Sequence, residues 1–107
     1  MSEFAGTLKE RIIIERHAGL RTASGLQTAG WEPIARCLAA IAAEGAGAEA
    51  EAQALSAMPR YRVTIRRRDG IAVGQRLIWG ARAMLVKQRI DDPKLPDRIL
   101  LRCEERR

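Results

Sequence analysis

Apolar and polar residues alternate in several stretches of the chain, and this alternation predicts strands with one face in a core. The stretches are residues 8–16, 60–68, 75–90 and 98–105. In the second stretch Tyr61, Val63 and Ile65 fall on one side, opposite arginines and a threonine. The third contains Gly80 followed by Ala81, a two-residue turn with glycine first, so it predicts two strands joined by a type II′ hairpin turn.

Residues 31–45 fit two periodicities. Ile34, Leu38 and Ile41 recur at helical spacing, and the alanines between them favour a helix. The alternative is a strand that uses alternate positions, namely Trp31, Ala35, Cys37, Ala39 and Ile41. The periodicity alone favours the helix slightly, so both readings remain open at this point.

The next segment is low in complexity. Gly45 and Gly47 interrupt whatever precedes them, Glu49–Ala57 has good helix propensity, and Pro59 ends it. With the glycine-bearing stretch 17–30 taken as a loop or loose hairpin connection, four or five strands and one helical insertion remain. Strands at short spacing, joined by turns, predict an all-β fold, a small antiparallel β-barrel or sandwich.

Length and charge limit the picture further. At 107 residues we expect a single domain that spans residues 1–107. The formal charge of +6 belongs to the second half, because residues 1–59 hold five basic and seven acidic residues, and residues 60–107 hold fourteen and six. The positive charge of the second half favours contact with a polyanion or with an acidic protein. The alternative is that the arginines simply lie on the solvent-exposed faces of strands.

The basic residues are densest at Arg66, Arg67 and Arg68, just before an Asp69-Gly70 turn. This triplet at a strand end is a candidate interface with a protein, with DNA, or simply with solvent. A sheet that stacks bases would interleave aromatic residues with the arginines on an exposed face. Here Tyr61 and Trp79 fall on the apolar sides of their strands, which favours core or interface anchors.

Groups that carry catalysis are few. His17, the sole histidine, falls in a predicted loop with no partner to orient it, and is expected to be solvated. Asp91 and Asp92 are adjacent carboxylates that are better explained as a turn before a proline. Cys37 and Cys103 lie too far apart for zinc-type spacing, so two free thiols are expected, with a disulfide as the alternative. We therefore expect no enzyme, no cofactor and no metal site.

Membrane and export signals are also missing from the pattern. The first residues lack a basic patch followed by an apolar run, so no signal peptide is expected. No apolar stretch approaches the roughly 20 residues that cross a bilayer. The expectation is a soluble protein with no membrane partner, located in the cytoplasm when made.

The ordered set of segments resembles the head-tail joining (head closure or stopper) proteins of long-tailed phages, prophages and gene transfer agents. The segments that carry the resemblance are "AGTLKERIIIER", a loop that reaches "GW", "YRVTIRRRDGI", "RLIWGARAMLVKQRIDD" and "ILLRCEE". The strongest match is Tyr61–Arg68 running into Asp69-Gly70-Ile71, and the weakest is the alanine-rich stretch from Glu44 to Met58.

The resemblance implies a fold and a role. The fold is a small antiparallel β-barrel or sandwich with a long insertion, about residues 44–58, after the second strand, and residues 32–42 become a strand. The role is that of a structural ring, six-fold or twelve-fold, which closes the DNA-filled head and docks the tail. Its partners would be a portal adaptor protein above and a tail terminator or tail tube protein below, and its place after assembly would be the particle neck.

Two site assignments follow from that role. Arg66, Arg67 and Arg68 would contact a partner protein, because the planar guanidinium pairs with carboxylates and stacks on apolar groups. Glu49 and Glu51 in the insertion would face the lumen and repel the phosphates of passing DNA, the alternative being a surface excursion. Two other functions stay open: a small basic barrel that binds nucleic acid nonspecifically, and a tail-completion protein of the same assembly.

Overall fold

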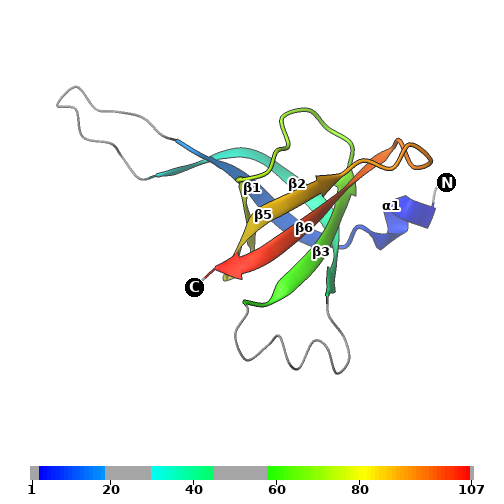
Figure 1. Cartoon of the computed structure of the whole chain (residues 1–107). Coiled ribbons are helices and arrows are strands. Elements are labelled where there is room, and N and C mark those ends of the chain that lie inside the picture. The colour runs from blue at the N-terminus through cyan, green and yellow to red at the C-terminus, as the bar shows by residue number, and fades with distance from the viewer. Residues whose placement is uncertain (1–2, 19–29, 45–57, 107) are drawn as a thin grey trace.

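The computed structural model describes residues 3–18, 30–44 and 58–106. Six antiparallel strands follow one short helix (Figure 1). The elements are α1 Glu3–Thr7, β1 Glu10–His17, β2 Trp31–Ala43, β3 Arg60–Arg66, β4 Arg76–Trp79, β5 Arg82–Ile90 and β6 Arg98–Arg106. The all-β prediction is confirmed, with more strands than the four or five expected.

The strands close into a barrel in the order β1-β2-β3-β6-β5-β4. Every neighbouring pair is antiparallel, including β4 with β1, which completes the circle. Within the barrel, closure pairs each strand with a neighbour on both sides and so covers edges through which sheets aggregate, while residues 31–38 of β2 pair with β1 alone. Of the two architectures that the sequence left open, the barrel is therefore correct.

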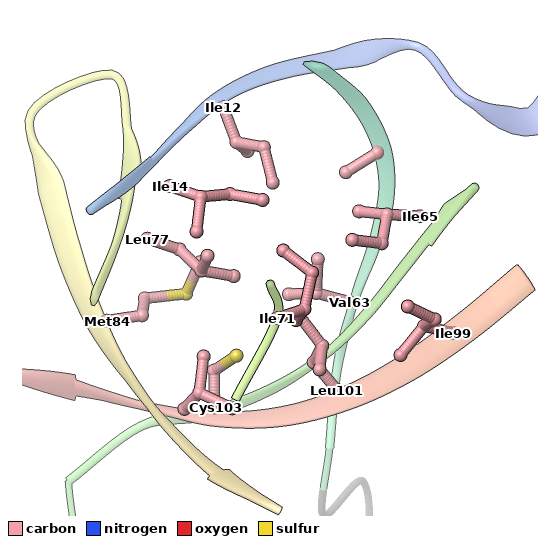
Figure 2. Close-up of a cluster of buried hydrophobic side chains, with 12 residues drawn as sticks. Ile12, Ile14, Val63, Ile65, Ile71, Leu77, Met84, Ile99, Leu101 and Cys103 are labelled. Carbon is pink, nitrogen blue, oxygen red and sulfur yellow. The ribbon is translucent and has the colours of Figure 1, made fainter. Parts of the chain in front are cut away.

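Inward side chains fill the barrel (Figure 2). They come from every strand, and from Ile71 in the loop between β3 and β4. The buried members are Ile12, Ile14, Ala39, Val63, Ile65, Ile71, Leu77, Met84, Val86, Ile99, Leu101 and Cys103. Small barrels have interiors only wide enough for side chains, and burying each large aliphatic group contributes about 1.5–3 kcal/mol.

β2 is a strand, against its local helical preference. Its register with β1 pairs Ile12 with Cys37 and Ile14 with Ala35, which turns the small residues of β2 inward. Ile34 and Leu38, two residues of the apparent helical stripe, lie exposed on the outside instead. The ladders to β1 and β3 and the closure of the barrel override the propensity of an alanine-rich segment.

The far ends of β1 and β2 extend away from the barrel as a two-stranded arm (Figure 1). The register shifts between Ile14 and Glu15, whose partners are Ala35 and Pro33, so Ile34 is an extra residue. Such a bulge bends a strand and also accommodates a proline. The shift lies at the base of the arm, where β2 leaves the barrel.

Two predicted turns have the backbone that they need. Gly80 joins β4 to β5 with φ of 58°, while Ala81 keeps a negative φ, as a type II′ turn requires. Gly70 follows Asp69 with φ of 85°, a conformation that favours glycine.

The helices differ from the prediction. α1 was not expected, and it buries Phe4, while Leu8 just after it is also buried. The Arg98 guanidinium lies 3.8 Å from the centre of the Phe4 ring. The predicted helix at Glu49–Ala57 lies outside the described residues.

Candidate functional site

The arginine triplet lies where β3 ends. Arg66 is the last residue of the strand, and Arg67 and Arg68 continue toward the turn at Gly70. Because Ile65 points into the core, Arg66 points outward, and all three arginines are exposed. Their surroundings nevertheless differ, so the triplet does not act as one unit.

Arg67 is bound to the segment that links β5 to β6. Its Nη2 atom lies 2.7 Å from Oδ1 of Asp91, and its Nε atom donates to the carbonyl oxygen of Pro96 at 2.8 Å. Arg89 donates to the same carboxylate, with 2.9 Å between Nε and Oδ2. Hydrogen bonds from Arg89 and then from Arg67 hold the pKa of Asp91 below its ordinary value. Arg67 therefore fixes a loop within the chain, and its contact with a partner protein stays a prediction.

Arg66 and Arg68 line a groove at the junction of β2 and β3, which we call the triplet groove. Its other lining residues are Arg67, Leu8, Cys37 and Leu38, and its volume is about 380 Å³. Neither Arg66 nor Arg68 has a carboxylate within ion-pair distance among the described residues. Burial raises the pKa of the Cys37 thiol, and the nearby Arg68 partly offsets that rise. The groove is a basic rim around apolar and thiol groups.

Tyr61 and Trp79 pack against the margin of the core, as predicted from their phase in the strands. Their ring centres lie 5.8 Å apart in an edge-to-face arrangement. Arg82 lies over both rings and donates to the Tyr61 hydroxyl at 2.6 Å. These aromatic rings are therefore not laid out on an open surface as a base-stacking platform would need.

The arm contains His17, which is exposed as expected, but the prediction of a loop position without a partner is wrong. His17 is the last residue of β1, and its ring meets Trp31 edge-on with centres 5.3 Å apart. The Arg76 guanidinium lies 4.6 Å from the centre of the Trp31 ring and forms an ion pair of 2.7 Å with Glu15. These contacts hold the base of the arm against β4, which is a structural role.

The remaining candidates also have structural explanations. Asp92 accepts the backbone N–H of Lys94 at 2.9 Å, which forms the turn predicted around Pro93. Cys37 and Cys103 are free cysteines, as expected. Glu49 and Glu51 lie outside the described residues, so their predicted place in a lumen stays a prediction.

Within residues 3–18, 30–44 and 58–106, no group of three His, Cys, Asp or Glu residues is placed to hold a metal ion. In the same part of the chain no helix is long and apolar enough to cross a membrane.

A carboxylate bound by two strands was not found from the sequence. Glu44, just after β2, has its Oε1 atom 3.6 Å from Arg62 Nε on β3 and 3.3 Å from Arg102 Nε on β6. The three residues are far apart in the chain, with Glu44 after β2, Arg62 on β3 and Arg102 on β6, so only the barrel brings them together. No local pattern signals such a contact.

Comparison with known proteins gives one family and a fold. The family model for phage head completion proteins matches residues 5–106. No curated protein matches the chain. Protein SF1141 from Shigella flexneri 2a, solved in solution, is 22% identical over 94% of each chain, with a TM-score of 0.74. A chain of the virion of a native gene transfer agent particle is 16% identical over 92% of this chain and 96% of its own, with a TM-score of 0.65. Both structures share the fold.

Proposed function

The chain belongs to the phage head completion protein family, and from that membership we propose that it is a ring subunit of the head-to-tail connector of a tailed phage or gene transfer agent. Membership confirms the resemblance read from the ordered segments of the sequence. A structural role in the head or neck of a phage-type particle follows from the family. The ring, its neighbours and its contact with DNA are the finer part of the proposal.

The observation that carries the proposal is the extent of the family match. Residues 5–106 include all six strands, so the barrel itself is the family domain. A closed barrel contacts its neighbours mainly through side chains and loops, here together with the two-stranded arm of β1 and β2. A subunit that docks several partners needs such exposed side chains and needs no catalytic group.

The proposed ring has six or twelve copies, with a portal adaptor protein above it and a tail terminator or tail tube protein below. DNA passes through its lumen without sequence recognition. We place the insertion between β2 and β3 in that lumen, where Glu49 and Glu51 repel phosphate and keep the DNA from adhering. The support for this is the charge of the segment, which holds only acidic charged residues.

The proposal is tested by deleting the gene from a strain that makes the particles. Because the head is then left open and undocked, we expect filled heads that lose DNA, together with free tails, and electron microscopy counts both. Supplying the intact chain in trans is the control, and it should restore tailed particles. Normal numbers of DNA-filled, tailed particles without the protein would exclude the role. Filled heads that retain their DNA, beside incomplete tails, would favour the tail-completion alternative.

A second candidate, nonspecific binding of nucleic acid, is favoured by the charge of +6 and by arginines that lack carboxylate partners. A DNA binder loses affinity steeply as salt rises, because phosphate contacts release counterions. Titration of duplex DNA with the purified protein at low and physiological salt separates the two functions. For a connector subunit we expect no measurable affinity at physiological salt.

A further inference from the structure

The triplet groove continues into a second groove on the outside of β1, β2 and β4. The two share Cys37 and Leu38, and the second, with a volume of about 600 Å³, adds Arg11, Ile12, Ile13, Arg36, Ile78 and Gly80. We call the combined surface the β1–β2 groove. It crosses the strands that carry the arm and ends at Arg66 and Arg68.

Strand register arranges the outward side chains of this surface in rows. Arg11 on β1 lies opposite Leu38 on β2, and two residues further along β1 Ile13 lies opposite Arg36. On its other side Ile13 pairs with Ile78 of β4. Leu38 is 46% exposed, the largest value for a large apolar side chain on any strand of the barrel. Arginines and aliphatic groups are therefore interleaved across one face.

The arginines of this face differ from the others in the described chain. Most described arginines lie within 3.9 Å of a carboxylate oxygen of the same chain. These are Arg16, Arg60, Arg62, Arg67, Arg76, Arg82, Arg89, Arg98, Arg102 and Arg106. The described arginines without such a partner are Arg11, Arg36, Arg66 and Arg68, and all four line the β1–β2 groove.

We propose that the β1–β2 groove binds an extended acidic segment with apolar side chains, contributed by another protein of the particle neck. The inference rests on the proposed function and names the chemistry of one docking partner. Carboxylates of the segment pair with the four arginines, and its apolar side chains cover Leu38, Ile13 and Ile78. The interleaving of charge and aliphatic groups on the groove matches a segment that alternates in the same way.

The described residues of a second copy of the barrel supply little of that chemistry. Most described carboxylates are already in ion pairs, namely Glu15, Glu32, Glu44, Glu104, Glu105, Asp91 and Asp97. Of the others, Glu10 accepts a hydrogen bond from the Trp79 indole at 3.2 Å. Asp69 and Asp92 are exposed and without ion pairs among the described residues, but they lie in separate loops and do not form an extended acidic segment. Because the proposed function assigns Glu49 and Glu51 of the insertion to the lumen, we assign the negative charge to a different chain.

DNA is the weaker occupant of this face. Phosphates would satisfy the arginines, but they would leave the exposed Leu38 and the partly exposed Ile13 and Ile78 uncovered. Bases would need aromatic side chains to stack on, and Tyr61 and Trp79 pack against the core instead.

The first test places a photo-reactive benzoylphenylalanine at Leu38 and, as a control, at the exposed Val73 in the loop between β3 and β4. Intact particles are irradiated and the cross-linked peptides are identified by mass spectrometry. We expect the Leu38 position to link to a peptide of another neck protein that holds more acidic than basic residues, and the Val73 position not to link to it. A link from Leu38 to DNA or only to the same chain, or no link in particles that contain the protein, overturns the inference.

The second test reverses charge. In the double variant Arg36→Glu, Arg66→Glu we expect the number of tailed particles to fall about tenfold or more, because like charges repel across the interface. Thermal unfolding should stay close to wild type, since neither arginine makes an ion pair within the described chain. The matched control is Lys87→Glu on β5, exposed, outside the groove and likewise without an ion pair there, and its particle number should match wild type.

The outcomes separate this inference from the proposed function. If deletion of the gene leaves undocked heads but the double variant assembles normally, the connector role stands and the groove is not its docking site. If deletion itself has no effect on particles, the proposed function fails first.

Discussion

Leu101 and Leu95 are residues of one type in opposite environments. Leu101 on β6 is fully buried in the barrel core, and Leu95 in the preceding loop is 40% exposed. Replacing Leu101 with alanine removes buried methyl groups and leaves a cavity, so we expect a loss of about 2–5 kcal/mol in unfolding free energy. Leu95→Ala is the control and should cost less than about 1 kcal/mol. Urea unfolding followed by circular dichroism measures both, and equal losses would contradict the core.

Cys103 gives the barrel a dependence on alkaline pH. Burial, and then the negative charge of Glu44, raise the pKa of its thiol from 9.0 to about 12. The folded chain therefore keeps the proton where the unfolded chain has lost it, so the stabilisation is complete below pH 9 and is lost as pH rises from about 9 to 12. We expect Cys103→Ala to show a weaker loss of stability than wild type across that interval, in unfolding curves at several pH values. Parallel curves for the two proteins would show that the thiol is not protected.

Among the strands, β2 shows how much of the secondary structure could be predicted from the sequence. The strands of the second half were predictable because alternation and turn glycines act locally, as at Val63, Ile65 and Gly80. The state of β2 was not, since its alanines favour a helix and only β1 and β3 on either side make it a strand. The resemblance to a family placed it correctly where the periodicity did not.

The candidate site could likewise be predicted only in part from the sequence. That Arg66–Arg68 would be exposed at a strand end follows from the alternation. That Arg67 would be bound by Asp91 and Pro96 depends on a loop far along the chain, and no spacing in the sequence announces it. The helical reading of residues 31–45 put Leu38 in an apolar stripe, and neither that reading nor the strand alternative predicted the groove that Leu38 lines.

The loop between β5 and β6 depends on Arg67. In Arg67→Ala the ion pair with Asp91 and the hydrogen bond to Pro96 are lost, and amide hydrogen exchange in residues 91–97 should quicken. Overall stability should change little, since the pair is exposed. Arg66→Ala is the matched control, because Arg66 has no ion pair among the described residues. Unchanged exchange in the loop would show that Arg67 does not hold it.

At the scale of the molecule, different strands of the barrel carry different exposed surfaces. The arm, the β1–β2 groove and the loop held by Arg67 all belong to one closed barrel. A partner bound at one of these surfaces therefore need not change the structure of another. The insertion lies between β2 and β3 in the chain. A subunit built this way is suited to touch several neighbours at once, which is what the proposed ring demands.

A reconstruction of the neck of intact particles by electron cryomicroscopy tests the central claim most directly. The account predicts a closed ring of copies of this barrel between the head and the tail, with the insertions toward the central channel and the β1–β2 groove covered by another protein. A neck that holds a single copy of the barrel, or a barrel found only elsewhere in the particle, would contradict it.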